Sequence, residues 1–388
     1  MKMGLEIYVH IPFCIKKCHY CDFLSFPAEE AVRDRYCLAL EKEIHQTAVF
    51  LGSEKTRRDS RHKEIVSTVF IGGGTPSLLS GKQVMKIMDC LRDHFSFREN
   101  VEITIEANPG TLDAEKLKLY REAGINRLSM GLQSTDNASL HRLGRIHTWE
   151  QGVKNYQEAR KAGFSNINLD LMSALPGQDL CSYVDGLKKV TELEPEHISS
   201  YSLILEEGTP FFSSKEIRRQ LPDEETEREM YEKTKEILQE KGYHRYEISN
   251  YAKAGRECRH NLGYWDEVPY LGFGLGASSC YGGARFSNER DILTYMAEPF
   301  RPFEKREDYA RQSRKEQMED YMIFGLRKTK GVSLSRFDRE YGCAWKEIYG
   351  EKIRRYEKIG LLIIEGDNLK LTDAGIDVSN RIFEDFLL

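Results

Sequence analysis

The chain has 388 residues, of which 40% are hydrophobic and 11% aromatic. That is enough for a large core and, at about 150 residues per domain, for two to three units. The 57 Lys and Arg against 62 Asp and Glu give a net charge of −5, which excludes a polybasic nucleic-acid or membrane-surface binder. No run of about 18 apolar residues occurs, and the amino terminus becomes polar too soon for a signal peptide. We therefore expect a cytoplasmic protein, whose nine cysteines are ligands, nucleophiles or core residues rather than disulfides.

Strands and helices alternate along the first 240 residues. Apolar alternation predicts strands, and apolar spacings of three and four predict helices. The expected strands are 7–11, 65–71, 101–105, 126–130, 164–171 and 197–203, and the helices that follow them are 30–50, 84–91, 113–123, 148–162, 180–187 and 223–241. Six such units predict an α/β fold, with a parallel sheet wound by right-handed crossovers into a partial (βα)6 barrel.

The remaining segments differ in character. The polar run 52–63 is expected to be a surface loop, and 242–290, rich in Tyr, Gly and Asn, to be extended structure and loops over the barrel mouth. We expect a helix over 306–327 and a hairpin at 361–371, which resemble a winged helix. Residues 301–388 hold 18 Lys and Arg against 17 Asp and Glu, so DNA binding is not expected. The expected units are a barrel at 1–241, an extension at 242–298 and a small accessory domain at 299–388.

Three cysteines follow the first expected strand, at Cys14, Cys18 and Cys21. Three thiolates within eight residues can converge on one metal centre, and the intervening Lys16 and Lys17 would offset their charge. Because no fourth cysteine lies near them in sequence, a [4Fe–4S] cluster held here would leave one iron open to a small chelating ligand. Zinc held by these cysteines together with His10 or His19 is the alternative.

Glycyl or polar groups follow four successive expected strands. These groups are Gly72-Gly-Gly-Thr-Pro76, Glu106-Ala-Asn-Pro-Gly110, Gly131-Leu-Gln-Ser134 and Asp170. The carboxyl ends of barrel strands face one mouth, so these groups should meet the cysteines there. Three consecutive glycines would let the backbone approach a ligand closely.

The cysteine spacing, three residues and then two, resembles that of the radical S-adenosylmethionine (SAM) superfamily. Within it, four phrases resemble the oxygen-independent coproporphyrinogen III oxidase family: Tyr8-Val-His-Ile-Pro-Phe-Cys14, Gly72-Gly-Gly-Thr-Pro-Ser77, Glu106-Ala-Asn-Pro-Gly110 and Leu175-Pro-Gly-Gln178. The resemblance implies a [4Fe–4S] cluster on the three cysteines and a bound SAM. The implied SAM contacts are Gly73, Gly74 and Thr75 for the amino end, Arg145 for the carboxylate, and Glu106, Gln133 and Asp170 for polar and ribose groups, with Tyr8 and Tyr20 beside the cluster.

That family contains an oxidase branch and a haem-chaperone branch. Phe23 stands where the oxidase motif carries a further cysteine, and 13 residues before the first cysteine leave no room for the oxidase's long amino-terminal extension. The segment His260-Asn-Leu-Gly-Tyr-Trp265 matches the HNxxYW segment to which haem binding is attributed in the chaperone branch. The resemblance therefore implies His260, with Cys258 as the alternative, as the haem ligand, and Tyr264 and Trp265 as flat faces for the macrocycle.

These resemblances imply a haem chaperone that passes haem to acceptor proteins and takes electrons from a donor such as a flavodoxin or ferredoxin. No nucleic-acid partner is expected, and membrane association is expected only through partners. No catalytic residue is assigned, and SAM cleavage is left open. The alternatives are oxidative decarboxylation of coproporphyrinogen III and an anaerobic haem-degrading or methyl-transferring radical SAM enzyme.

Overall fold

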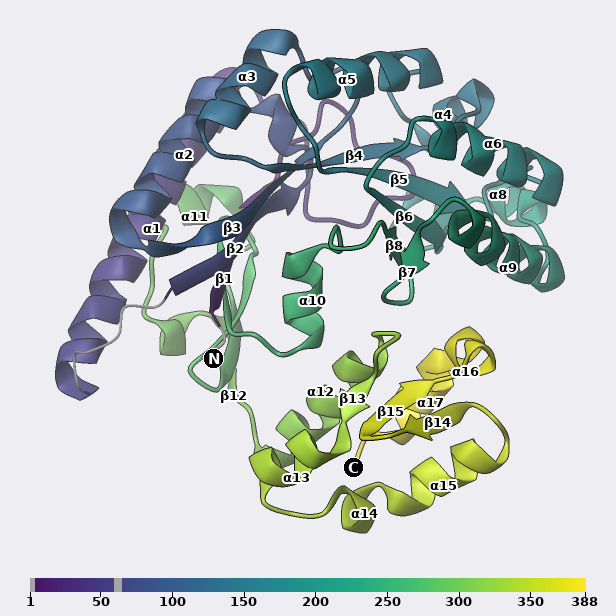
Figure 1. The fold of residues 1–388 in the computed structure, drawn as a ribbon. Helices are drawn as coiled ribbons and strands as arrows, with labels where there is room; N and C mark the ends of the chain where they lie inside the picture. The colour runs from purple at the N-terminus through teal and green to yellow at the C-terminus, as the bar shows by residue number, and fades with distance from the viewer. Residues whose placement is uncertain (1–3, 59–64) are drawn as a thin grey trace.

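The structure, a computed structural model, describes residues 4–58 and 65–388. Six parallel strands lie in sequence order in a curved sheet whose outer face is covered by helices (Figure 1). The strands are β1 (Leu5–Ile11), β2 (Ile65–Gly73), β3 (Ser96–Ala107), β4 (Arg127–Gln133), β5 (Ile167–Ser173) and β6 (His197–Ser202). All six expected strands are present, which confirms the α/β class and the partial (βα)6 barrel.

The helices between these strands also follow the predicted order. They are α1 (Glu30–Arg58), α2 (Gly81–His94), α3 (Ala114–Glu122), α5 (Trp149–Lys161), α6 (Leu180–Glu192) and α9 (Glu224–Glu240), with the short helices η1 (Pro76–Leu78), α4 (Asn137–Leu143), α7 (Pro210–Ser213) and α8 (Lys215–Gln220). Ser80 and Thr148 start α2 and α5 with capping boxes, which satisfy backbone N–H groups that the helix leaves free. The polar run 52–63 was wrongly expected to be a loop throughout, because α1 continues to Arg58; 59–63 lie outside the described residues.

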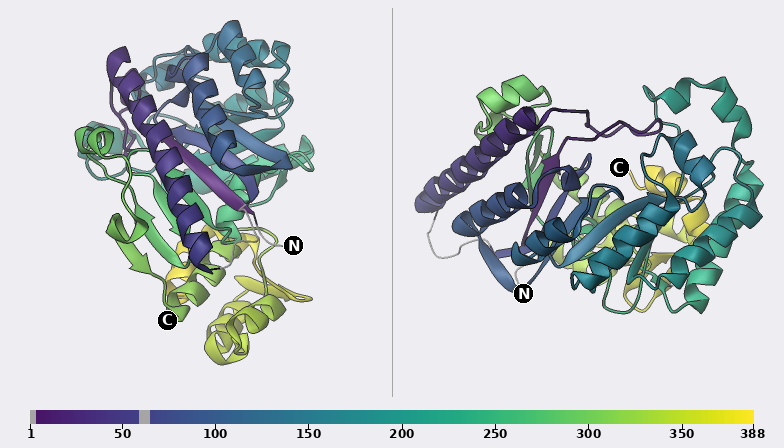
Figure 2. Two further views of the ribbon diagram at one scale, coloured as in Figure 1. Left: turned by 90° about the vertical axis from the view of Figure 1, so that its left-hand side faces the viewer. Right: turned by 90° about the horizontal axis from the view of Figure 1, so that it is seen from above.

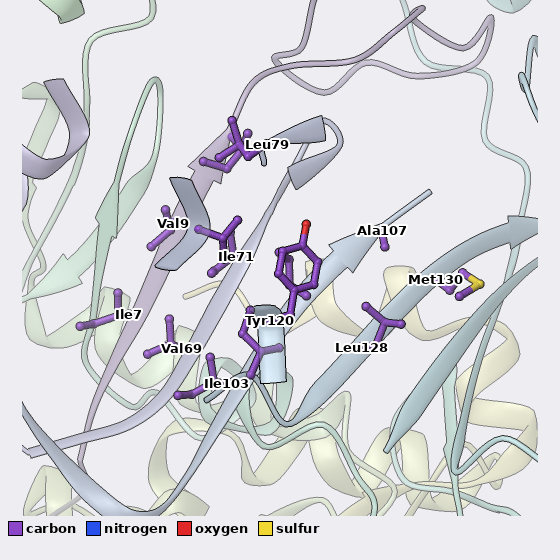
Figure 3. Close-up of a cluster of buried hydrophobic side chains, with 14 of the residues drawn as sticks. Ile7, Val9, Val69, Ile71, Leu79, Ile103, Ala107, Tyr120, Leu128 and Met130 are labelled. Atoms are coloured by element: carbon purple, nitrogen blue, oxygen red, sulfur yellow. The ribbon is translucent and has the colours of Figure 1, made fainter. Parts of the chain in front are cut away.

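The core lies between the sheet and its outer helices, and Figure 3 shows side chains that the strands contribute to it, among them Ile7, Val9, Val69 and Ile71. Ile7, Val9, Val69 and Ile71 have no exposed surface, because parallel strands are covered on both faces. Burial of each such side chain stabilises the fold by roughly 1.5–3 kcal/mol. The strands are therefore held firmly at their centres, which fixes the positions of the residues at their carboxyl ends.

The chain after α9 extends this sheet at both edges. Beyond β6 lie β8 (Asn250–Ala252) and β7 (His244–Arg245), and beyond β1 lie β9 (Tyr270–Phe273), β10 (Ser278–Tyr281), β11 (Ala284–Ser287) and β12 (Glu307–Arg311). Strand β9 pairs parallel with β1. Helix α10 (Arg259–Trp265), which was not expected, packs against β2 on the inner side of the sheet (Figure 1), and α11 (Ile292–Ala297) and η2 (Phe303–Lys305) precede β12.

A small carboxyl-terminal domain lies beside the barrel (Figure 2). Its elements are α12 (Arg314–Leu326), β13 (Val332–Ser333), α13 (Leu334–Tyr341), α14 (Trp345–Ile348), α15 (Gly350–Lys358), β14 (Leu362–Glu365), β15 (Asn368–Leu371), α16 (Asp373–Asp377) and α17 (Ser379–Asp385). The expected hairpin is confirmed as β14 and β15. The helix expected from 306 begins only at Arg314, because Glu307–Arg311 pair with β11. No helix among the described residues is long and apolar enough to span a membrane.

Candidate functional site

Two adjoining cavities open at the inner side of the sheet. The strand-end cavity, of about 580 Å³, is lined by the three cysteines and the carboxyl ends of β2 to β6. The domain cavity, of about 690 Å³, is lined by α10, by β9 to β11 and by α12 and α13 of the carboxyl-terminal domain. Five residues line both cavities: Tyr8, Phe23, Gly73, Glu106 and Tyr264.

The cysteine loop leaves β1 and brings all three thiols to the strand-end cavity. Cys14, Cys18 and Cys21 line it, are partly buried and form no disulfide. The Thr75 hydroxyl donates to Cys14 Sγ at 3.5 Å, and Arg145 Nη1 donates to Cys18 Sγ at 3.7 Å. Burial raises the pKa of the Cys21 thiol, and the neighbouring Cys18 and Cys14 raise it further. Three thiols with mutually repelling thiolates suit a positively charged metal centre.

The glycines after β2 are required by close packing. A Cβ on Gly73, whose φ is +115°, would lie 2.5 Å from a ring carbon of His10, and one on Gly74 would lie 2.7 Å from the Phe13 carbonyl oxygen. The Gly73 N–H donates to Glu106 Oε2 at 3.0 Å. The turn therefore places bare backbone against the cysteine loop and the cavity, as the glycine run predicted.

Two carboxyl groups face the strand-end cavity from β3 and β5. Burial, aided by the charge of Asp170, raises the pKa of Glu106 to about 8. Burial also raises the pKa of Asp170, although hydrogen bonds from Asn168 and Ser199 oppose the shift. Glu106 is consequently protonated at neutral pH, so that its carboxyl group can donate a hydrogen bond to a ligand oxygen as well as accept one.

Arg145 supplies the cationic group beside the cysteines. Its Nη2 donates to the Gly131 carbonyl at 2.6 Å and to Asn108 Oδ1 at 2.7 Å. Its Nε is buried and has no hydrogen-bond partner among the described residues. Gln133, in the left-handed region at φ +69°, accepts a hydrogen bond from the Tyr201 hydroxyl at 3.1 Å. The guanidinium is thus held in place with a donor left for an anionic ligand.

The predicted SAM residues gather at one place. Gly73, Gly74, Thr75, Glu106, Gln133, Arg145, Asp170, Tyr8 and Tyr20 all line the strand-end cavity. Sequence reasoning missed Asn108, Tyr201 and Arg127, which line it too. Arg127 was the one with a visible signal, because a cation inside an otherwise apolar strand is unusual; it is 2% exposed, and its Nε has no partner among the described residues.

The HNxxYW segment lies in α10, and its histidine is buried in the wall of the strand-end cavity. His260 is 1% exposed, with Nδ1 hydrogen-bonded to Thr68 Oγ1 at 2.7 Å and Nε2 to the Tyr264 hydroxyl at 2.9 Å. Burial lowers its pKa to about 3, so that the ring is neutral. Cys258 is wholly buried, and burial raises its pKa to about 12. Both proposed iron ligands are thus engaged inside the protein.

The aromatic residues of this segment reach the cavities. Tyr264 lines both, and Trp265 lines the domain cavity. The Trp265 ring lies 6.2 Å from that of Phe324 in α12, and the Arg327 guanidinium lies 4.4 Å from the Trp265 ring centroid. The Trp265 Nε1 is buried with no partner among the described residues. Aromatic ring faces and the Trp265 indole N–H therefore border the domain cavity.

The residues present fit an iron–sulfur cluster better than zinc. Among the described residues, no three His, Cys, Asp or Glu side chains are arranged to share one metal ion. His10 is hydrogen-bonded through both nitrogens, and His19 through Nδ1. Thiols that bind three different irons of a cluster stand farther apart than thiols that share one zinc. Three cysteines around one cavity, with the unpartnered Arg145 Nε nearby, suit a cluster with a chelating ligand.

Comparisons with known proteins agree with this geometry. The chain matches the Radical SAM superfamily over residues 8–190 and the HemN C-terminal domain over residues 312–378. It is 39% identical to "Heme chaperone HemW" of Bacillus subtilis, over 98% of each chain. It is 37% identical to that of Lactococcus lactis, over 98% of this chain and 97% of that one. The solved structure of coproporphyrinogen III oxidase (HemN) from Escherichia coli has a TM-score of 0.85 at 24% identity, covering 100% of this chain and 90% of that chain.

The barrel, the cysteine loop and the strand-end cavity together define a radical SAM protein. The likeness to HemN shows the fold alone, because the identity is low. The curated relatives show more, since they match nearly the full length of both chains at 37% and 39% identity. The chain belongs to the HemW family.

Proposed function

We propose that this protein is a haem chaperone of the radical SAM type, which binds haem, a [4Fe–4S] cluster and SAM and passes haem to acceptor proteins. The observation that carries the proposal is the match to a protein named as a heme chaperone, at 39% identity over 98% of this chain. The matched region includes the carboxyl-terminal domain, which forms part of the domain cavity. Phe23, in place of the oxidase's further cysteine, and the HNxxYW segment support the chaperone branch over the oxidase.

Cys14, Cys18 and Cys21 would hold the cluster. Bound there, it would supply electrons, taken from a donor such as a flavodoxin or ferredoxin, to the sulfonium group of SAM. The chain's own residues would bind and orient SAM: the glycine turn would accommodate its amino end, and Arg145 its carboxylate. The protonated Glu106 and the neighbouring Asp170 would hold its polar and ribose groups. In this proposal the cluster and SAM control haem assembly or release.

The domain cavity supports the haem part of the proposal. Its volume of about 690 Å³ lies within the range of cofactor-sized pockets. The lining combines Tyr264, Trp265, Tyr270 and Phe324 with the cations Arg285 and Arg336. Aromatic rings suit a flat apolar macrocycle, and guanidinium groups suit propionates. We propose that acceptors meet the protein in the cytoplasm and that it has no nucleic-acid partner.

The test uses anaerobically reconstituted full-length protein. We expect saturable haem binding near one haem per chain, and no protoporphyrinogen when the protein is incubated with coproporphyrinogen III, SAM and reductant. Haem-loaded protein is then mixed with apo-haem proteins from the same cell. A transfer rate that rises with acceptor concentration supports direct delivery. Protoporphyrinogen at catalytic rates, or haem release at one rate whatever the acceptor, would refute the proposal.

A further inference from the structure

One buried cation in the strand-end cavity lacks a partner for its donors. Arg127 begins β4, is 2% exposed and lines this cavity. Its Nε is buried without a hydrogen-bond partner among the described residues. A guanidinium carries five N–H donors in a fixed plane and no acceptor, and a buried charge is costly unless its donors are matched. A group that accepts hydrogen bonds must therefore meet Arg127 in the cavity.

The carboxyl groups near Arg127 do not supply this acceptor. The charges of Glu102 and Asp170 act on Arg127, but both groups hydrogen-bond elsewhere. Glu102 accepts from two backbone N–H groups at the start of α10, each at 3.2 Å, and Asp170 accepts from Asn168 Nδ2 at 2.7 Å. Neither forms an ion pair with Arg127 in the described part of the chain, so they act on it only through space. The fold leaves the guanidinium open to the cavity.

Two further donors lie in the same part of the cavity. Strand pairing sets Ser129 beside Glu106, and Arg127 lies two residues before Ser129, on the same face of β4. Ser129 Oγ accepts from Asn168 Nδ2 at 2.9 Å, which leaves its own O–H to donate. The protonated Glu106 accepts from the Gly73 N–H and can donate as well. We call these three cavity-lining side chains, Arg127, Ser129 and Glu106, the cavity floor.

The carboxylate of SAM lies too far from the cavity floor to be the missing acceptor. Arg145, its proposed contact, donates to Cys18 Sγ and to the Gly131 carbonyl. Gly131 follows Arg127 by four residues on β4, which at about 3.3 Å per residue is roughly 13 Å along the strand. A carboxylate bound by Arg145 beside the cysteines is therefore a separate group from one bound by Arg127.

We propose that the cavity floor binds the carboxylate group of a second organic ligand beside SAM, with the guanidinium of Arg127 as its counter-ion. A carboxylate matches a guanidinium through two parallel hydrogen bonds. A phosphate dianion fits less well, because Glu102 and Asp170 already place acidic groups nearby. The carboxylate belongs either to a free aliphatic acid or to a propionate arm of a porphyrin. A ligand held there shares one cavity with SAM, the proximity that a reaction between them requires.

The test uses full-length protein with its cluster assembled anaerobically and SAM present, at constant ionic strength. Propionate is the probe, and propionamide, similar in shape but uncharged, is its control. Equilibrium dialysis should show saturable propionate binding, with propionamide at least about tenfold weaker, because charge-assisted hydrogen bonds are the stronger ones. Arg127→Gln should weaken propionate binding at least about tenfold and leave SAM affinity within about twofold of wild type.

Two more variants and one measurement on wild type locate the site. Arg285→Gln removes a guanidinium from the domain cavity and should bind propionate as wild type does. Arg127→Lys keeps the charge without the planar donors, so its affinity should lie between those of wild type and Arg127→Gln; it replaces Arg127→Gln if that variant does not fold. In wild type, propionate should raise the melting temperature more than propionamide does, since a ligand that binds the folded state stabilises it.

Haem and its dimethyl ester identify the source of the carboxylate. If the carboxylate is a haem propionate, Arg127→Gln weakens binding of haem but not of the ester, and propionate competes with haem. If it belongs to a free acid, Arg127→Gln binds haem as wild type does, and propionate and haem bind together. Either pattern supports the site at the cavity floor.

Three results would overturn the proposal. Equal propionate affinity in wild type and Arg127→Gln, or equal affinity for propionate and propionamide, would leave water as the acceptor at Arg127. Loss of propionate binding confined to Arg285→Gln would place the anion in the domain cavity. An equal loss of SAM affinity in Arg127→Gln would show that SAM itself fills the cavity floor. The propionate titrations contain no haem, so a failure of haem binding would refute the chaperone function alone.

Discussion

The strand-end cavity and the domain cavity share a wall but are built in different ways. The first is formed by carboxyl ends of neighbouring parallel strands, with Glu106, Arg145 and Asp170 placed around three thiols. The domain cavity is formed by α10, by the hairpin of β10 and β11, and by α12 and α13 of the carboxyl-terminal domain. Radical chemistry needs fixed groups, which a buried sheet provides. The shape of the domain cavity depends instead on how the barrel and the carboxyl-terminal domain pack together.

The largest expected effect is the loss of the cluster from the strand-end cavity while haem binding in the domain cavity persists. Replacement of Cys14 by Ser removes one of three cluster ligands, so iron and acid-labile sulfide should fall from about four per chain to near zero. Haem binding should persist, because the domain cavity contains no part of the cysteine loop beyond Phe23 and Leu24. Metal analysis and haem titration of the same preparation measure both. Cys181→Ser, on the exposed surface of α6, is the control; loss of haem binding in Cys14→Ser would show the cavities to be interdependent.

A smaller effect is expected for the SAM contact. Arg145→Lys removes the planar, multidentate donor and should weaken SAM binding roughly ten- to hundredfold, since hydrogen bonds to charged groups contribute about 1.5–3 kcal/mol. Equilibrium dialysis against cluster-loaded protein measures this. Arg219→Lys, on the exposed α8, should bind SAM as wild type does. Equal SAM affinity in Arg145→Lys would contradict the predicted carboxylate contact.

A carboxyl group buried beside His260, that of Glu6, should make stability depend on pH. Burial raises the pKa of Glu6 from 4.5 to about 9, so the folded state keeps a proton that the unfolded state loses. This contribution is complete below about pH 4.5 and is lost as pH rises toward 9. In Glu6→Gln, the free energy of unfolding should therefore fall less steeply with rising pH than in wild type, by up to about 1.4 kcal/mol per pH unit.

Urea denaturation at about pH 6 and about pH 8 tests this prediction. The control is Glu115→Gln at an exposed position of α3, which should retain the wild-type slope. A Glu6→Gln slope equal to that of wild type would mean that Glu6 is ionised in the folded protein.

The smallest expected effect concerns the contact between the carboxyl-terminal domain and the segment that follows α10. Lys328, after α12, forms an ion pair with Asp266, after α10. Asp266 is 41% exposed, so Lys328→Ala should lower stability by less than about 1 kcal/mol and haem affinity by less than about fivefold. Thermal unfolding and haem titration measure these values. A much larger loss of haem affinity would show that this pair closes the domain cavity.

Much of the strand-end cavity could be predicted, because its signals are local. Apolar alternation located β1 to β6, and residues at successive strand ends meet wherever parallel strands lie side by side. Asn108 was missed because its side chain contacts Arg145 and Thr75, which are distant in the sequence. Arg127 was missed because its acidic partners Glu102 and Asp170 come from other strands.

The domain cavity could be predicted only in part, because distant segments make it. Helix α10 has seven residues, too few for a periodic pattern, and its His260, Tyr264 and Trp265 all border cavities. Strand β9 has four residues and pairs with β1, more than 250 residues earlier in the chain. The sequence motif singled out this segment, but not that it forms a helix between the two cavities.

The most direct test of two separate sites is a count of both ligands in one sample. Full-length protein, reconstituted anaerobically and saturated with haem, is analysed for haem, non-haem iron and sulfide per chain. Our account predicts one haem together with about four non-haem iron and four sulfide in the same molecules. Haem that displaces the cluster, or cluster assembly that expels haem, would contradict it.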